Sequence, residues 1–271
     1  MSNSPKGTAL ITGASAGIGA VYADRLAKRG YDLILVARNE KRLRELSDRL
    51  AGETGRLVTV IRADLNNRAE LAGVEARLHK DPSITMLVNN AGAASVAPLL
   101  NADVQKMEEI ISLNVTALTR LTYAAVPAFV KRGAGTIINI ASIVGISPET
   151  LNGVYGASKA FVLAFSHSLQ HEVGAKGIRI QAVLPGATAT ELWENAGLPY
   201  QNLPPDIVMT PEELVDAALV GLDQGEEVTI PPLQNEEEWT HFEATRRALS
   251  RRFGNSVPAP RYRRSPENGA L

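Results

Sequence analysis

The 271-residue chain contains no cysteine. This absence excludes disulfides, thiolate nucleophiles and cysteine-based metal sites. Only four histidines are present, and His167 and His171 have the spacing of a zinc-binding pair, but the residues between them lack the glutamate of H-E-x-x-H. We therefore expect helix-surface histidines and no metal site.

Long apolar runs and a strong net charge are also missing. The first residues contain no apolar region of signal-peptide length, and no segment is apolar enough to span a bilayer. With a formal net charge of -1, the protein has no overall positive electrostatic field that would attract nucleic acid or membranes. Arginines cluster in residues 246–264, where an exposed helix and a solvated tail explain them more simply than a basic binding surface. We expect a cytoplasmic protein with no nucleic-acid or membrane partner.

Short β-branched runs alternate with longer amphipathic segments. A parallel strand that is covered on both faces needs nearly continuous hydrophobicity, and seven runs fit this pattern: 8–12, 32–37, 57–63, 86–90, 136–142, 179–185 and 226–232. Helical patterns occupy residues 17–30, 39–52, 67–80, 103–133, 155–177 and 210–225. The alternation predicts an α/β fold with a doubly wound parallel sheet (Rossmann fold) of about seven strands and helices on both faces.

Two segments interrupt this alternation. We expect a single catalytic domain over residues 1–253, in which the proline-containing segment 186–211 is long enough to form a lid; a plain surface excursion is the alternative. Residues 254–271 are polar and punctuated by proline, which predicts a weakly ordered C-terminal tail.

A glycine-rich turn follows the first predicted strand and contains Gly13, Gly17 and Gly19. Glycines allow the backbone to approach a pyrophosphate, whose charge can be met by the free N–H groups and the dipole of the following helix. The spacing is G-x-x-x-G-x-G and differs from the G-x-G-x-x-G fingerprint. Its place between a strand and a helix favours a nucleotide site over a plain turn.

The end of the second strand indicates which nucleotide is used. An NAD site usually has an acidic residue there, whereas this chain has Ala37 followed by Arg38. The missing carboxylate removes repulsion against a 2′-phosphate, and a guanidinium can pair with that group. We expect NADP(H) to be preferred and NAD(H) to be possible. The alternative is that Arg38 simply begins the charged helix that follows.

Tyr155 and Lys159 are four residues apart in a predicted helix and share one of its faces. A cation beside a phenol favours the phenolate, which predicts a tyrosine pKa below its usual value of about 10. By itself this spacing is common and also fits a surface helix with an amphipathic stem.

Seven short motifs extend the pattern along the chain: TGASAGIG at 12–19, ADL at 63–65, NNAG at 89–92, SLNV around Asn114, IAS ending at Ser142, YGASK at 155–159 and PGATAT at 185–190. With these motifs in this order, the chain resembles the short-chain dehydrogenase/reductase family in its compact single-domain form. The resemblance extends from near the N-terminus to about residue 230. Each motif is weak, but together they are highly specific.

The resemblance implies four catalytic residues. Tyr155 would be the general acid toward a carbonyl, and the Ser142 hydroxyl would bind the carbonyl oxygen. Lys159 would lower the pKa of the phenol and bind the nicotinamide ribose. Asn114 would hold a water that links Lys159 to solvent, although a packed amide is the alternative for this residue.

The same resemblance implies the cofactor site. Asp64 and Leu65 would flank the adenine, and Thr188 would hold the nicotinamide carboxamide. A capping aspartate and an N-cap threonine are the respective alternatives for Asp64 and Thr188, and a plain turn is the alternative for residues 90–92. The implied cofactor-binding residues are Gly13, Ser15, Gly17, Ile18, Gly19, Arg38, Asp64, Leu65, Asn90, Ala91, Gly92, Tyr155, Lys159, Pro185 and Thr188.

The expected function is an NADP(H)-dependent oxidoreductase that moves a hydride between the nicotinamide and a small-molecule carbonyl or secondary alcohol. The resemblance implies that the B face of the nicotinamide is used. The resemblance also implies a homodimer or homotetramer. One alternative is a 3-oxoacyl-thioester (acyl-carrier-protein) reductase, but residues 226–253 predict an additional helix that such enzymes usually lack. Another is a non-catalytic dinucleotide-sensing protein, which the presence of both Tyr155 and Lys159 disfavours.

Overall fold

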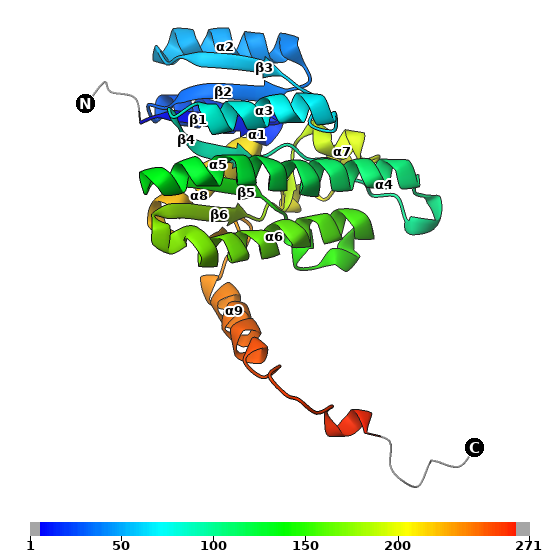
Figure 1. The fold of residues 1–271 in the computed structure, drawn as a ribbon. Coiled ribbons are helices and arrows are strands. Elements are labelled where there is room, and N and C mark those ends of the chain that lie inside the picture. The colour runs from blue at the N-terminus through cyan, green and yellow to red at the C-terminus, as the bar shows by residue number, and fades with distance from the viewer. Residues whose placement is uncertain (1–5, 264–271) are drawn as a thin grey trace. The chain divides into compact units, whose positions relative to one another are not determined.

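Seven parallel strands form the centre of the computed structural model, which describes residues 6–263 (Figure 1). The strands follow the order β3-β2-β1-β4-β5-β6-β9. Their bounds are β1 Thr8–Thr12, β2 Asp32–Ala37, β3 Val58–Arg62, β4 Ile84–Asn89, β5 Gly135–Ile140, β6 Ile178–Val183 and β9 Val228–Thr229. The predicted doubly wound parallel sheet is confirmed, and each predicted strand is present.

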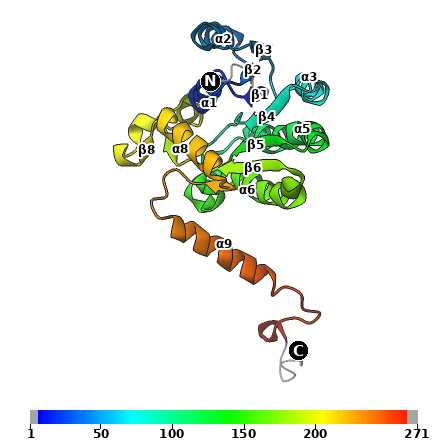
Figure 2. The same ribbon diagram turned by 90° about the vertical axis from the view of Figure 1, so that its left-hand side faces the viewer.

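Helices cover both faces of this sheet, as the view in Figure 2 shows. One face carries α1 (Gly17–Lys28), α2 (Glu40–Thr54) and α8 (Pro211–Gln224), and the other carries α3 (Arg68–Lys80), α5 (Leu118–Arg132) and α6 (Gly153–Val173). Strand residues alternate between the two apolar cores: Ala9 and Ile11 pack on the α1 side, and Leu10 packs on the α5 side. This burial on both faces explains why the strands are so uniformly apolar.

A buried polar network attaches α6 to the sheet. Asn89 Nδ2 on β4 donates to Asn139 Oδ1 on β5 over 2.9 Å, and Asn139 Nδ2 donates to Ser166 Oγ on α6 over 2.9 Å. Asn89 Nδ2 also donates to Thr122 Oγ1 over 3.1 Å. Because buried polar groups are costly unless they are hydrogen-bonded, these pairings fix how α6 sits on the strands.

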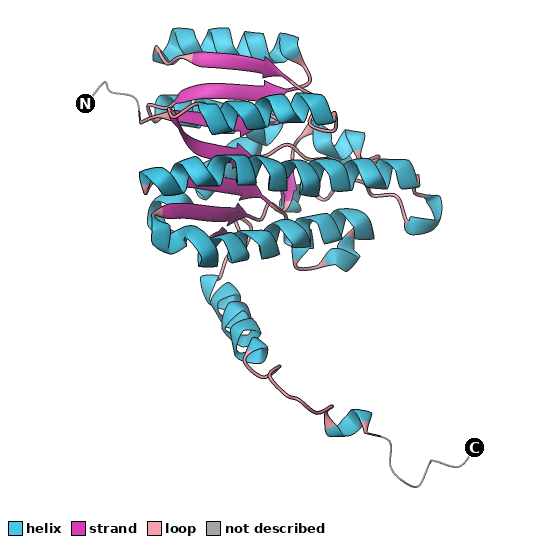
Figure 3. Ribbon diagram, viewed as in Figure 1, coloured by secondary structure: helices cyan, strands magenta, loops and turns pink. Residues whose placement is uncertain are grey.

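The segment predicted as a lid has secondary structure of its own (Figure 3). It contains β7 (Ala187–Thr188), α7 (Glu191–Asn195) and β8 (Val208–Met209), and β7 pairs with β8 in a separate two-stranded sheet. The long predicted helix 103–133 also differs in detail. It consists of α4 (Val104–Ile111), a π-helical stretch (Ser112–Ala117) and α5.

The described residues divide into two compact units, 6–232 and 233–263. The second unit contains α9 (Glu236–Ser250) and a short 3₁₀ helix (Pro260–Tyr262). The extent of the catalytic domain, which the sequence placed at residues 1–253, stays a prediction. Residues 264–271 of the predicted tail lie outside the described residues. No helix between residues 6 and 263 is long and apolar enough to cross a membrane.

Candidate active site

The four predicted catalytic side chains lie at the carboxyl end of the sheet. Tyr155 and Lys159 belong to the first two turns of α6, and Ser142 follows the end of β5 by two residues. Lys159 Nζ donates to the carbonyl oxygen of Ile140 over 2.8 Å. A Cβ placed on Gly92, after β4, would lie 3.2 Å from Asn114 Oδ1 and 3.5 Å from Lys159 Nζ. The structure therefore brings these segments together.

Asn114 is fully buried and holds the backbone that follows β4. Its Oδ1 accepts from the Ala93 N–H over 2.8 Å, and its Nδ2 donates to the Ala93 carbonyl and to Ser158 Oγ, each over 2.9 Å. The π-helical stretch around Asn114 was not predicted, and such stretches are often found at functional sites. These contacts fit the alternative interpretation, in which Asn114 is a packed amide. A water held by Asn114 that links Lys159 to solvent stays a prediction.

Burial controls the two titratable groups. It raises the pKa of Tyr155 to about 12, with a hydrogen bond to Ser142 acting in the opposite direction. Burial also lowers the pKa of Lys159 to about 8. The prediction that the phenol has a lowered pKa is therefore wrong for this structure. Lys159 Nζ gives its hydrogen bond to Ile140 and lies 5.9 Å from the centroid of the tyrosine ring, so it does not offset the burial of the phenol.

Asn152 positions Tyr155 and was missed in the sequence. It caps α6: its Oδ1 accepts from the N–H groups of Val154 over 2.9 Å and Tyr155 over 3.4 Å. Its Nδ2 donates to the Ala97 carbonyl over 2.6 Å and so ties the helix start to the segment after β4. An asparagine just before a helical pattern is an ordinary N-cap signal and could have identified it.

The glycine-rich turn and the NNAG motif are packed tightly together. Gly13 and Gly17 have φ of 65° and 52°, in the left-handed region that favours glycine. A Cβ on Gly13 would lie 2.8 Å from Asn90 Nδ2 and 2.9 Å from Ala91 Cα. Ala16 is the N-cap of α1 and offers no side-chain acceptor, which leaves the first N–H groups of α1 available to an anion. The turn, including Ser15 and Ile18, therefore fits a pyrophosphate.

Thr12 joins these two segments from the end of β1. Its Oγ1 accepts from the N–H groups of Asn90 and Ala91, each over 3.0 Å, and donates to the Val88 carbonyl over 3.3 Å. Asn90 Nδ2 donates back to the carbonyls of Thr12 over 2.9 Å and Gly13 over 3.2 Å. Thr12 belongs to the TGASAGIG motif, but its role in holding these two segments together was not predicted from the sequence.

Arg38 lies between the buried end of β2 and α2, and its side chain is exposed. The helix begins at Glu40 and is capped by Asn39, so the alternative in which Arg38 begins the helix is wrong. Among residues 6–263, no side chain forms an ion pair or hydrogen bond with its guanidinium. Arg38 is therefore available to an anionic ligand.

Two further predicted cofactor residues are differently placed. Leu65 is buried, whereas Asp64 is partly exposed and its Oδ1 accepts from the Asn66 N–H over 3.0 Å. This local contact matches the capping role that was the alternative for Asp64. A role toward adenine stays a prediction.

The segment 186–211 begins beside the predicted catalytic residues and passes over the glycine-rich turn. The carbonyl of Pro185 accepts from Ser142 Oγ over 3.3 Å. Thr188 is buried and its Oγ1 donates to the Gly186 carbonyl over 3.2 Å, while the N-cap of α7 is Thr190, so the N-cap alternative for Thr188 is wrong. A Cβ on Gly17 would lie 3.0 Å from Thr190 Cγ2.

One ion pair connects α7, within residues 186–211, to α2. Arg42 Nη1 lies 2.8 Å from Glu191 Oε2, with side chains that are 44% and 54% exposed. Ion pairs this exposed contribute only about 0–1 kcal/mol. The contact can therefore break at little cost.

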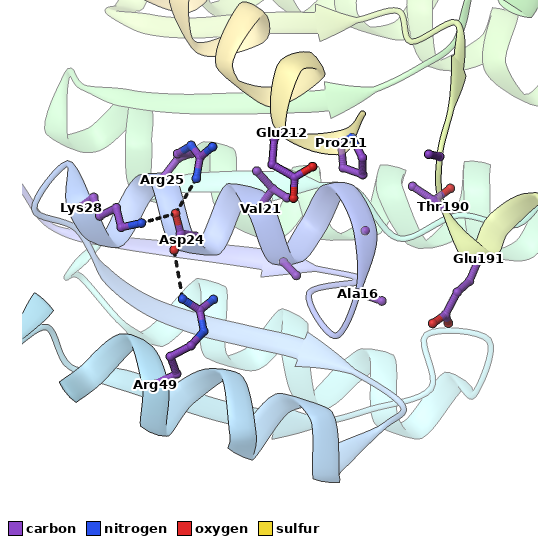
Figure 4. A pocket seen from close by; sticks show the side chains of 13 residues that line it. Ala16, Val21, Asp24, Arg25, Lys28, Arg49, Thr190, Glu191, Pro211 and Glu212 are labelled. Carbon is purple, nitrogen blue, oxygen red and sulfur yellow. Dashed lines mark hydrogen bonds and ion pairs between the residues drawn. The ribbon is translucent and has the colours of Figure 1, made fainter. Parts of the chain in front are cut away.

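A cavity of about 460 Å³ lies on the outer side of α1, next to the glycine-rich turn (Figure 4). The Asp24 carboxylate forms ion pairs there with Arg25 over 2.7 Å, Lys28 over 2.8 Å and Arg49 over 3.2 Å. None of the four predicted catalytic residues lines this cavity. Across residues 6–263 there is also no group of three or more histidine, aspartate or glutamate side chains that could hold a metal ion.

Comparison with known proteins adds independent information. Residues 7–200 match the family model described as short chain dehydrogenase. A short-chain dehydrogenase from Sphingobium yanoikuyae, solved in complex with NADPH, is 49% identical, and the match covers 95% of this chain and 100% of that one with a TM-score of 0.92. A bulky-bulky ketone specific alcohol dehydrogenase from Comamonas testosteroni is 45% identical over 96% of this chain and 99% of that one, with a TM-score of 0.88.

The chain is also similar to a protein whose described activity differs from that of the alcohol dehydrogenase. The very-long-chain 3-oxoacyl-CoA reductase of Anas platyrhynchos is 35% identical over 225 residues, which are 79% of this chain and 69% of that protein. The family-model match includes all the motifs found between residues 12 and 190.

Replacing Gly13 with alanine tests the phosphate-binding turn. The new Cβ would collide with Asn90 and Ala91 in a backbone conformation that alanine rarely adopts. We expect Gly13→Ala to lose at least about tenfold in NADPH affinity, or about 1.4 kcal/mol, measured by fluorescence titration. Gly52→Ala is the matched control, because no atom lies within 4 Å of its added Cβ in α2. Unchanged NADPH binding by Gly13→Ala would contradict this account of the turn.

The lowered pKa of Lys159 predicts a pH-dependent stability. The pKa of this lysine is about 8 in the folded protein and 10.5 in the unfolded chain. Between these two pH values the unfolded chain binds more protons than the folded protein, so the free energy of unfolding rises with pH. Lys159→Met removes this gain. Urea unfolding of both proteins should therefore give a wild-type-minus-variant difference that increases from pH 8 to pH 10. Tyr155, whose pKa is raised, affects the two proteins alike and only above pH 10. A difference that does not change with pH would contradict the burial of the cation.

Proposed function

Because this chain belongs to the short-chain dehydrogenase family, we propose that it is an NADP(H)-dependent oxidoreductase acting on ketones and secondary alcohols, with Tyr155 as its general acid and base. The observation that carries the proposal is the buried pair of Tyr155 and Lys159 at the carboxyl edge of the sheet, beside Gly92 and Asn114. Ligands of open α/β sheets bind outside this edge.

The proposed chemistry divides between the cofactor and the chain. The bound nicotinamide supplies or accepts the hydride. Tyr155 donates its phenolic proton to the carbonyl oxygen, and its pKa of about 12 keeps that proton in place at neutral pH. An alkoxide is more basic than a phenolate, so the transfer is favourable in the direction of reduction. The hydrogen bond between Ser142 and Tyr155 favours the phenolate that remains, the Ser142 hydroxyl orients the carbonyl oxygen, and Lys159 would bind the nicotinamide ribose.

The proposed cofactor preference rests on the end of β2. Arg38 is exposed and unpaired among the described residues, and Ala37 presents no carboxylate to a 2′-phosphate. The relative from Sphingobium yanoikuyae was solved with NADPH, which supports the same choice here. The pyrophosphate would lie at the N-terminus of α1, and residues 90–92 would pass the riboses.

Ketones with two bulky substituents are the proposed substrate class, supported by the 45% identity to the Comamonas testosteroni enzyme. A 3-oxoacyl thioester is the second candidate, because a relative with that described activity is 35% identical. Both substrates would present a carbonyl to Tyr155, so the two classes differ in what surrounds the carbonyl and not in the chemistry.

We further propose that residues 186–211 form a lid. The segment passes over Gly17 at Thr190, and the exposed ion pair between Arg42 and Glu191 is weak enough to open. Closing such a segment would exclude water from the reacting carbonyl.

A homo-oligomer and a cytoplasmic location complete the proposal. On α5 and α6, Tyr123 and Phe161 are exposed, and the rings of both stack on Phe165. An apolar aromatic face of this kind fits contact with a second copy of the chain.

The acid role of Tyr155 predicts a selective loss of turnover. Tyr155→Phe should keep its NADPH affinity while kcat falls by about 10²-fold or more, since a positioned proton donor supplies that much. The assay follows NADPH oxidation with a bulky aryl ketone and with a 3-oxoacyl thioester, and the wild type should prefer the ketone. Near-normal turnover of Tyr155→Phe would remove the phenol from the mechanism, and preference for the thioester would favour the second candidate.

Arg38 predicts the cofactor ratio. A charge-assisted hydrogen bond to the 2′-phosphate contributes about 1.5–3 kcal/mol, so Ala37→Asp with Arg38→Ala should shift the ratio of kcat/KM for NADPH over NADH toward NADH by about 10- to 100-fold. Arg44→Ala is the control, because Arg44 is also exposed near the start of α2 but pairs with Glu40. A wild-type protein that already prefers NADH would refute the assignment.

A further inference from the structure

Arg42 lies in the first turn of α2, and its ionic partner is distant in the sequence. Two neighbouring cations, Lys41 and Arg44, pair instead with glutamates of α2 itself, one turn away. Arg42 Nη1 lies 2.8 Å from Glu191 Oε2, which belongs to α7. The ion pair of Arg42 therefore joins two separate parts of the fold.

Both of these parts contact the glycine-rich turn. The Ala14 N–H donates to the Val36 carbonyl over 3.3 Å, so the turn lies against the end of β2, just before α2. A Cβ on Gly17 would lie 3.0 Å from Thr190 Cγ2, and Thr190 directly precedes Glu191 in the chain. Glu191 also lines the same cavity as the start of α1, as Figure 4 shows. The ion pair therefore lies beside the proposed cofactor site.

A 2′-phosphate would bind close to this ion pair, because the residues after the second strand of such folds meet the adenosine ribose. A phosphate monoester carries a charge of about -1.5 to -2 at neutral pH and has three acceptor oxygens. Arg38 supplies one positive charge, so about half of the phosphate charge is left unmatched. Arg42 is four residues further along, and its side chain is 44% exposed. It can therefore supply the second cation.

Glu191 is the competitor for that cation. Carboxylates and phosphates both form charge-assisted hydrogen bonds with a guanidinium, so a 2′-phosphate and Glu191 would compete for Arg42. The Glu191 side chain is 54% exposed, and ion pairs between exposed side chains are weak. A phosphate with nearly twice the negative charge, held in place by the rest of the dinucleotide, would displace the carboxylate.

We propose that Arg42 is a second binding residue for the 2′-phosphate of NADPH, and that Glu191 occupies it until NADPH displaces the carboxylate. NADH has no 2′-phosphate and leaves the ion pair intact. This inference rests on the proposed function for the nicotinamide dinucleotide. It adds that the segment 186–211 takes part in the choice between the two cofactors and is released from α2 when NADPH binds.

Fluorescence titration with NADPH and with NADH tests the inference without turnover. Arg42→Ala removes a charge-assisted contact, so it should weaken NADPH binding by about tenfold and leave NADH binding unchanged. Glu191→Gln removes the competitor, so it should tighten NADPH binding by about two- to fivefold, again without a change for NADH. Arg44→Ala is the matched control and should change neither affinity, because Arg44 is exposed in the same helix but pairs with Glu40.

The double variant separates competition from a general effect of charge. If Glu191 acts by occupying Arg42, then Glu191→Gln should gain nothing once Arg42 is alanine. The double variant should therefore bind NADPH as weakly as Arg42→Ala alone. An equal gain from Glu191→Gln with and without Arg42 would overturn the competition.

The remaining outcomes also decide the inference. Unchanged NADPH binding by Arg42→Ala would overturn it, and so would equal losses for NADPH and NADH in both single variants, which indicate an ion pair that only supports the structure. A wild-type protein that binds both cofactors equally would overturn it together with the proposed NADPH preference. The predicted binding pattern in a protein that reduces no ketone would support this inference and refute the proposed activity.

Discussion

Lys159 is buried at the carboxyl end of the sheet, where its ammonium group donates to the Ile140 carbonyl over 2.8 Å. Holding a cation away from water is costly, and the lowered pKa of this lysine expresses that cost. The surrounding chain is built around it. Gly92 passes so close that a Cβ would lie 3.5 Å from Nζ, and Asn114 bonds both backbone groups of Ala93 to hold this segment in place. Tyr155, Gly92 and Asn114 of the proposed site are therefore arranged around this one desolvated charge.

The fold supplies the two rigid supports that such a site needs. Strand order reverses between β1 and β4, and open α/β sheets bind ligands at such a point. Thr12 on β1 bonds the backbone of Asn90 and Ala91 after β4, so the segments that follow these two strands are held together. On the other side of the site, the network from Asn89 through Asn139 fixes α6, while Asn152 fixes its first turn. Phosphate binding and proton transfer are therefore positioned by hydrogen bonds within one sheet edge.

Much of this architecture could be predicted from sequence, because its causes are local. Apolar β-branched runs gave the strands, and the four-residue spacing of Tyr155 and Lys159 placed them on one face of α6. Other features depend on tertiary packing. The raised pKa of Tyr155 results from burial by segments distant in sequence, so the neighbouring lysine alone suggested the wrong direction. The π-helical stretch around Asn114 has no period that a helical pattern reveals, and the β7–β8 pair within residues 186–211 is only two residues long in each strand. Asn152 carried a readable N-cap signal that was overlooked.

At the site formed by Tyr155 and Lys159, we propose that a hydride and a proton reach a carbonyl. Isotope transfer tests it most directly. The protein would be incubated with a bulky aryl ketone and with NADPH deuterated on either the B face or the A face of the nicotinamide, and the alcohol would be examined by mass spectrometry. The account predicts one deuterium at the carbinol carbon from the B-face cofactor and none from the A-face cofactor. An alcohol without deuterium from the B-face cofactor, or no alcohol at all across a varied set of ketones, would contradict it.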